Sequence, residues 1–281
     1  MKMKNRWFPV SRGCLSRLIA TPRSWVVMIV TALYLQKILA PVRAMLAAER
    51  LTINPMGLMV YLLNDTAVTA FLALACLALM FDAPCTDELQ RYLILRTGRK
   101  SWAVGQAVYM LLAVAAYLLL ATLIAWLLLL PHIEMSAGWG SGLRALVEDF
   151  QWETYGSDLN YDVWIPRAYA PIPAWLIEGA LHALAIALLC MLMMLANLLL
   201  DRRLSFVLVA LPIGFDIMLD EYFGVEAYYL SPLSLSKLSG LNYGDGMGRP
   251  PVWFGALALS LLLALCAAAF VRGARRRELK M

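Results

Sequence analysis

Few side chains in this sequence combine a reactive type with a spacing that supports catalysis. The two histidines, His132 and His182, lie far apart, and neither has a metal-ligating partner nearby. The sequence contains no H-E-x-x-H motif of a metalloprotease. The glycine-rich stretch 244–248 lacks the Lys-Ser/Thr ending of a phosphate-binding loop. The five cysteines lack metal-ligand spacing and are typical of small packing residues. We therefore expect a non-catalytic chain without a cofactor of its own.

A second group of polar residues interrupts long apolar stretches: Asn64, Asp65, Glu178, His182 and Asp216. An acid near the bilayer centre costs about 2.5–3.5 kcal/mol on insertion scales, so it should face protein or water. Asn64, Asp65 and Asp216 are candidates for lining a translocation path, with Asp65 well inside the bilayer on a continuous helix. The alternatives are a contact that locks helix packing for Asp65, and a position near the outer surface for Asp216. Glu178 and His182 are one helical turn apart and are expected to pair.

The most distinctive polar segment follows the second apolar stretch. Pro84 ends that stretch, and Thr86 with the acids after it is typical of a helix N-terminus. Gly98 is a typical helix end, so the sequence predicts a short helix over 86–97. This helix either docks on a cytoplasmic partner or simply lies on the membrane surface. The candidate docking residues are Asp87, Glu88, Arg91, Tyr92, Leu95, Arg96 and Arg99.

These residues need a scaffold, and the composition indicates which kind. The 281 residues are 62% hydrophobic and 15% charged, whereas soluble domains carry about a quarter charged residues. Stretches that stay apolar on every side exclude the alternating pattern of a barrel strand, and backbone groups in lipid then require helices. The sequence predicts an all-α integral membrane protein with about six transmembrane helices. The expected spans are 24–41, 56–81, 103–130, 174–199, 204–219 and 252–271, and the fifth is short and interrupted by Pro212 and Gly214.

The distribution of basic residues predicts the orientation of these spans. Lys and Arg concentrate in the N-terminal segment, in the loops after spans two and four, and in the tail 272–281. By the positive-inside rule, both termini are cytoplasmic and the chain is a multi-pass membrane protein. Residues 1–23 are expected to form a basic amphipathic helix at the inner interface.

Two long loops are then expected outside the cell. The loop 131–173 is rich in acids and aromatic residues, and its apolar residues from Leu143 to Phe150 recur at helical spacing. It is either an aromatic belt at the interface or a lid that handles substrate. The loop 220–251 is too apolar for a solvated loop and too broken for a span, which favours a re-entrant or interfacial element.

This layout resembles a known family. The N-terminal interfacial helix, six spans and short first-loop helix look like the permease subunits of ABC-2 type export transporters. Residues 96–102, Arg-Thr-Gly-Arg-Lys-Ser-Trp, resemble a divergent bacterial branch of these permeases, and Leu230-Ser231-Pro232 resembles their re-entrant element. The Glu- and Gly-rich stretch of better-known members is absent, and the loop 131–173 departs from many members.

The resemblance implies a dimer of permease subunits, identical or different, in which each subunit binds a separate cytoplasmic P-loop ATPase. The helix from Asp87 to Leu95 would sit in a groove of the ATPase, which hydrolyses the ATP. Spans two and five would line the path between subunits. The resemblance to a bacterial branch also implies a location in the bacterial cell (inner or plasma) membrane. The remaining partner is membrane lipid, and no nucleic acid is expected.

Two other function classes stay open from the sequence. An ion-coupled secondary transporter would use Asp65 or Asp216 as its proton or sodium carboxylate, although no inverted repeat is visible. A non-transporting immunity or assembly factor would use the loop 131–173 as its recognition surface. The sequence identifies no cargo.

Overall fold

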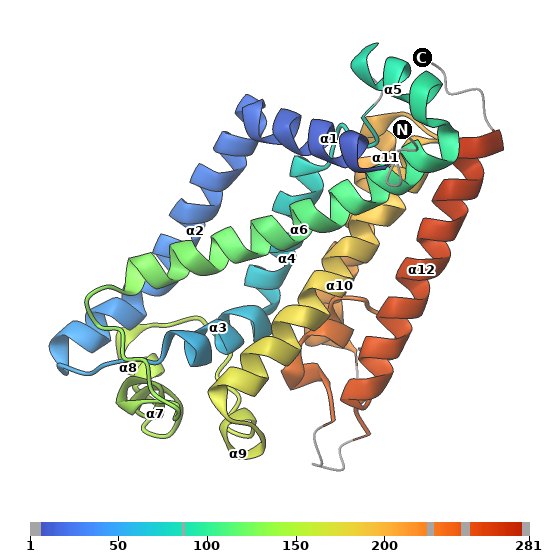
Figure 1. Cartoon of the computed structure of the whole chain (residues 1–281). Coiled ribbons are helices and arrows are strands. Elements are labelled where there is room, and N and C mark those ends of the chain that lie inside the picture. Colours follow the sequence, from blue (N-terminus) through green and yellow to red (C-terminus); the bar gives the residue numbers. More distant parts are fainter. Residues whose placement is uncertain (1–6, 86–87, 224–227, 243–247, 277–281) are drawn as a thin grey trace.

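Four long apolar helices form the body of the protein, in a computed structural model that describes residues 7–85, 88–223, 228–242 and 248–276 (Figure 1). They are α2 (Pro22–Ala48), α6 (Arg99–Leu129), α10 (Pro171–Asn197) and α12 (Val252–Arg276). All four are long and apolar enough to cross a membrane. Helix α10 is the central helix. In its most apolar stretch 61% of the residues are buried, whereas the corresponding share in α12 is 17%. The described residues contain no strand beyond two isolated β-bridges.

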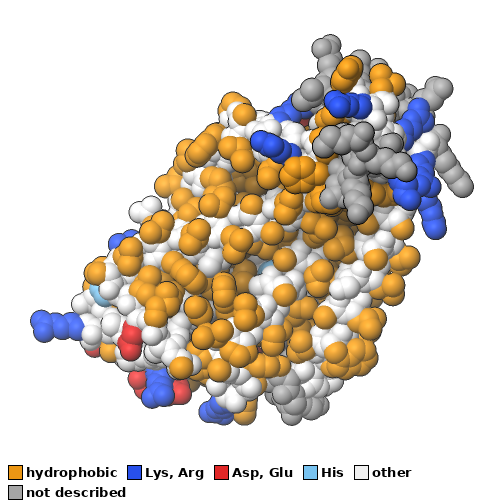
Figure 2. Space-filling model, in the orientation of Figure 1, with side chains coloured by type: hydrophobic (Ala, Val, Ile, Leu, Met, Phe, Trp, Pro, Cys, Tyr) orange, Lys and Arg blue, Asp and Glu red, His pale blue; other side chains and the backbone are white. Residues whose placement is uncertain are grey.

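Many large hydrophobic side chains on the outside of these helices are exposed. Leu33 on α2, Leu127 on α6 and Leu257 on α12 are each more than half exposed. Figure 2 shows hydrophobic side chains across the middle of the visible face, with charged side chains gathered at its two ends. An apolar surface of this extent requires lipid as its solvent. The chain is therefore an all-helical membrane protein.

The second predicted span, 56–81, is not one continuous helix. It consists of α3 (Pro55–Asn64) and α4 (Thr66–Leu79), which meet at an angle of 85°. Asp65 has an extended backbone between them, and its carboxylate accepts a hydrogen bond from the Val68 amide at 2.8 Å. Asn, Asp and Thr compete for backbone hydrogen bonds and favour helix ends, which explains a break at this point. The prediction of one continuous helix through Asp65 is therefore wrong.

The fifth predicted span lies within a longer helix, α11 (Arg202–Tyr222). Its N-terminus is capped by Asp201, whose carboxylate accepts a hydrogen bond from the Leu204 amide at 3.2 Å. Helix α11 is not among the helices that are long and apolar enough to cross a membrane by themselves. The reason is its charged residues, which lie at both ends and, as Asp216, within the helix. Length and composition thus support four spans, or five when α3 and α4 count as one bent span.

Shorter helices occupy the two ends of the bundle (Figure 1). Helices α1 (Phe8–Ala20) and α5 (Glu88–Thr97) lie at the same end as the C-terminus of α12, here called the α5 end. Helices α7 (Ser141–Val147), α8 (Gln151–Tyr155) and α9 (Ile165–Ala168) lie at the opposite end, here called the α7 end. Two 3-10 turns, η2 (Ser234–Ser236) and η3 (Leu238–Gly240), follow α11. Leu235 and Leu238 in these turns and Leu233 just before them are buried.

Candidate functional site

A buried ion pair joins α11 to the segment that contains η2 and η3. Lys237 Nζ lies 3.2 Å from Asp216 Oδ2, and the two side chains are only 3% and 0% exposed. Asp216 Oδ1 also accepts hydrogen bonds from the hydroxyls of Ser231 and Ser234. Lys237 also donates a hydrogen bond, 2.8 Å long, to the Thr66 hydroxyl at the start of α4. Buried charges need this degree of compensation, and Asp216 is enclosed by protein.

Two other polar residues from the apolar stretches hold the same segment. The Ser239 amide donates to Asn64 Oδ1 at 2.7 Å, and the Leu238 amide donates to Glu178 Oε1 at 3.5 Å. Asn64 ends α3, and Glu178 lies on the central helix α10. We call Asn64, Glu178, Asp216 and Lys237 the polar core. It fastens the residues around η2 and η3 to three separate helices.

The structure brings two of the three predicted path residues into the polar core and leaves the third beside it. Asn64 and Asp216 contact neighbouring parts of the segment 231–239. Asp65 is only partly buried, and its carboxylate caps α4. Asp65 is nonetheless adjacent in the chain to Thr66, which accepts the hydrogen bond from Lys237.

The expected pairing of Glu178 with His182 is wrong. His182 Nδ1 lies 3.0 Å from the backbone oxygen of Glu178, and Nε2 lies 3.3 Å from the Thr69 hydroxyl. The Glu178 carboxylate instead faces Leu238, and its buried Oε2 has no hydrogen-bond partner among the described residues. The reason is that the two side chains point in different directions. The His182 imidazole contacts the backbone of α10 and Thr69 on α4, whereas the Glu178 carboxylate points toward η3.

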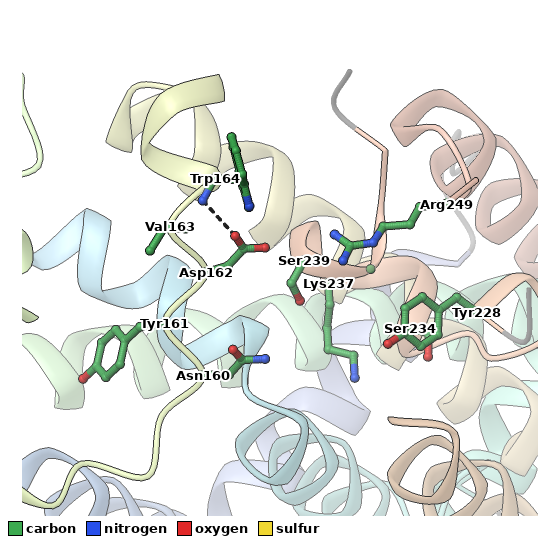
Figure 3. Close-up of a pocket in the computed structure, with 11 residues that line it drawn as sticks. Asn160, Tyr161, Asp162, Val163, Trp164, Tyr228, Ser234, Lys237, Ser239 and Arg249 are labelled. Atoms are coloured by element: carbon green, nitrogen blue, oxygen red, sulfur yellow. Dashed lines mark hydrogen bonds between the residues drawn. The ribbon is translucent and has the colours of Figure 1, made fainter. Parts of the chain in front are cut away.

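A polar cavity of about 450 Å³ is lined in part by Lys237, the cation of this ion pair (Figure 3). One wall is the chain from Asn160 to Trp164, where Asp162 Oδ1 accepts a hydrogen bond from the Trp164 amide at 2.8 Å. The facing wall includes Ser234, Lys237 and Ser239 (Figure 3). The cavity therefore has a polar lining that ends at a buried positive charge.

Tyr161 contributes a neutral hydroxyl to the loop that forms this wall. Burial raises the pKa of Tyr161, and a hydrogen bond with Ser157 opposes that shift. The two hydroxyl oxygens are 3.0 Å apart. The phenol therefore stays protonated across the physiological pH range.

The sequence-based interpretation missed Lys237 as a site residue. The signal was present, because Lys237 is the only charged residue of the apolar and serine-rich stretch 230–241. A single buried lysine in such a stretch needs an acidic side chain to compensate its charge. Asp216 lies on α11, the helix that precedes this stretch.

At the α5 end, the predicted docking helix has one fixed face and one open face. Gln90 and Ile94 are buried, and the Trp102 indole donates to Gln90 Oε1 at 3.2 Å. Tyr92 is 67% exposed and Leu95 is 85% exposed. Asp87 lies outside the described residues, as do the side chains of Glu88 and Arg91 within α5.

The arginines of this region are at the surface. Arg96 and Arg99 are exposed, and Arg99 Nη1 donates to the backbone oxygen of Arg275 at 3.3 Å. The start of α6 thereby contacts the end of α12. The open face of α5 thus adjoins a basic surface.

A buried glutamine ties α5 to its neighbours. Gln106 on α6 is fully buried, and its side-chain oxygen accepts from the Cys85 amide at 3.1 Å. Its Nε2 donates to Cys14 Sγ on α1 at 3.2 Å and to Gln90 Oε1 at 3.5 Å. These hydrogen bonds link α5, α1 and α6, so a displacement of α5 would have to break them or move the other two helices.

Comparison with models of protein families and with curated protein sequences finds no match to this chain. Within the part of the chain that the structure describes, no group of three His, Cys, Asp or Glu side chains could hold a metal ion.

Proposed function

We propose that this chain is the transmembrane permease subunit of an ABC exporter and works with a separate cytoplasmic P-loop ATPase. The observation that carries the proposal is the open face of α5. Leu95 is the most exposed large hydrophobic side chain among the described residues, and Tyr92 lies beside it on the same polar helix. Aromatic and aliphatic side chains next to arginines are typical of a protein-binding surface.

The arrangement of helix ends supports a six-span topology for this subunit. Counting α3 with α4 as one bent crossing and α11 as another brings the number of spans to six. Helix α1 and the C-terminal end of α12 share the α5 end (Figure 1), as an even number of crossings requires. Arg23, Arg96 and Arg202 also belong to the α5 end, which favours its assignment to the cytoplasm of a bacterial cell.

The polar core is the proposed route for cargo in this subunit. Asn64 belongs to α3, Asp65 caps α4 and Asp216 belongs to α11, and these elements correspond to spans two and five. In this conformation the segment 231–239 fills the space between them. We propose that the ion pair of Asp216 with Lys237 must open for passage, and that a second permease subunit, identical or different, completes the path.

The test is copurification of the full-length chain with a P-loop ATPase from the cell that encodes it. We expect Leu95→Glu to weaken ATPase binding by about tenfold or more, since loss of a buried interface anchor costs at least about 1–2 kcal/mol. Leu199→Glu is the matched control, because Leu199 is 57% exposed, follows the end of α10 and is not part of α5.

Both variants are first checked for the elution volume and thermal unfolding of the parent protein. Unchanged ATPase binding and unchanged ATPase stimulation in Leu95→Glu would contradict the proposal. Transport by the purified chain without any ATPase would contradict it as well.

A second candidate function is ion-coupled transport, and one observation favours it. Glu178 is fully buried, and its Oε2 has no hydrogen-bond partner in the described part of the chain. Ionisable groups at membrane depth commonly mark proton or ion pathways. Uptake or efflux in vesicles driven by a pH gradient alone, and lost in Glu178→Gln, would support this candidate over the exporter.

A further inference from the structure

A second cavity lies at the α7 end, apart from the polar core. It has a volume of about 550 Å³ and is bounded by α3, α7 and α9. It adjoins the cavity of Figure 3 only at Val163, and neither Asp216 nor Lys237 lines it. Its volume falls within the range of about 300–1,000 Å³ that is typical of small-molecule sites.

The floor of this cavity is aromatic and tightly packed. Tyr61 is fully buried, and its ring centroid lies 6.0 Å from that of Trp139 and 5.3 Å from that of Tyr161. Its hydroxyl donates to the backbone oxygen of Asp162 at 3.3 Å. A Cβ added at Gly57 would lie 2.6 Å from a Leu143 methyl group, so α3 and α7 are in close contact. The floor is therefore preformed and apolar.

The rim of the cavity is charged. Arg144 and Glu148 are one turn apart at the exposed side of α7, and Arg167 comes from α9. The Arg167 guanidinium lies 4.7 Å from the ring centroid of Trp164. Neither Arg144 nor Arg167 takes part in an ion pair among the described residues. Two arginines against one glutamate leave the rim with an excess of positive charge.

An exposed aromatic ring with an unusual backbone completes the mouth. Phe150 has φ of 52°, in the left-handed region, and its side chain is 56% exposed. A bulky residue rarely adopts this conformation, and such strain clusters at ligand-binding positions. Phe150 thus holds an apolar surface at the rim beside the charged groups.

We infer that this cavity binds an amphipathic organic anion. Its carboxylate or phosphate head would contact Arg144 and Arg167, because guanidinium groups match the geometry of both anions. Its apolar body would pack on Tyr61, Trp139 and Leu143. The inference goes beyond the exporter proposal and does not depend on it, since binding at this cavity requires no ATPase.

The experiment uses the full-length chain in nanodiscs of neutral phosphatidylcholine, without an ATPase. The probe is an octyl phosphate that carries a photoreactive diazirine on its alkyl chain, and labelled residues are mapped by mass spectrometry. We expect labelling within residues 139–150 and 163–167. Octyl phosphate should compete with the probe and octylamine should not, because only the phosphate has the charge that the rim attracts.

Variants at the rim make the test specific. Replacing Arg144 and Arg167 together by Gln should lower labelling about tenfold or more, as expected for losing charge-assisted hydrogen bonds. Replacing Arg43 and Arg50 by Gln removes the same charge at the end of α2, outside the cavity, and should leave labelling unchanged.

Three results would overturn the inference. The first is labelling spread over the lipid-facing sides of α2 and α12 regardless of the rim arginines. The second is competition by octylamine as strong as that by octyl phosphate. The third is competition by inorganic phosphate as strong as that by octyl phosphate, because the apolar floor would then contribute nothing.

Discussion

Among single residues, Asp216 and Lys237 do most to determine the conformation of the segment after α11. Their charges are almost fully buried, and each has further hydrogen-bonding partners in the serines and in Thr66. Removing one partner of a buried pair leaves the other charge uncompensated, which is more harmful than removing both. The two residues should therefore behave as a unit when they are mutated.

This leads to a stability prediction for the ion pair. Lys237→Met should destabilise the protein by about 3–5 kcal/mol, because Asp216 then stays buried without a cation. The double variant Asp216→Asn/Lys237→Met should recover a large part of that loss. Thermal unfolding in a single detergent measures both, with Lys100→Met as a control at an exposed lysine. An unfolding temperature of Lys237→Met equal to that of the parent would contradict the buried pair.

At the scale of elements, the helices were largely predictable and their contacts were not. Long apolar stretches predicted α2, α6, α10 and α12 because hydrophobic length follows from the thickness of the bilayer. The break at Asp65 was missed, since the residues on both sides are equally apolar and only three polar residues mark the boundary. The polar core joins residues from α3, α10, α11 and the chain around η2. These residues are far apart in the sequence, so no local sequence pattern predicts their contacts.

The packing of α4 against α10 provides an element-level test. Cys76 on α4 and Cys190 on α10 are buried, with their sulfur atoms 3.9 Å apart. We expect mild oxidation to join these two residues within one chain, as detected by mass spectrometry of peptides from the unreduced protein. Cys190→Ala should abolish the product, while Cys266→Ala should not affect it. Efficient coupling of Cys76 to Cys266 in place of Cys190 would show that the helices pack differently.

At the scale of the whole molecule, lipid surrounds the apolar middle of the bundle and water covers its two ends (Figure 2). The α5 end carries the proposed ATPase surface, and the α7 end carries the cavity with the charged rim. The two surfaces have distinct roles only when they face opposite sides of the membrane. The proposed function therefore depends on this orientation.

The most direct test of that claim is thiol labelling in intact cells with a membrane-impermeant maleimide. Glu153→Cys introduces an exposed thiol on α8, and Lys100→Cys introduces one at the start of α6. We predict that Glu153→Cys reacts in intact cells, whereas Lys100→Cys reacts only after the membrane is permeabilised. Protection of Glu153→Cys together with labelling of Lys100→Cys in intact cells would contradict the account.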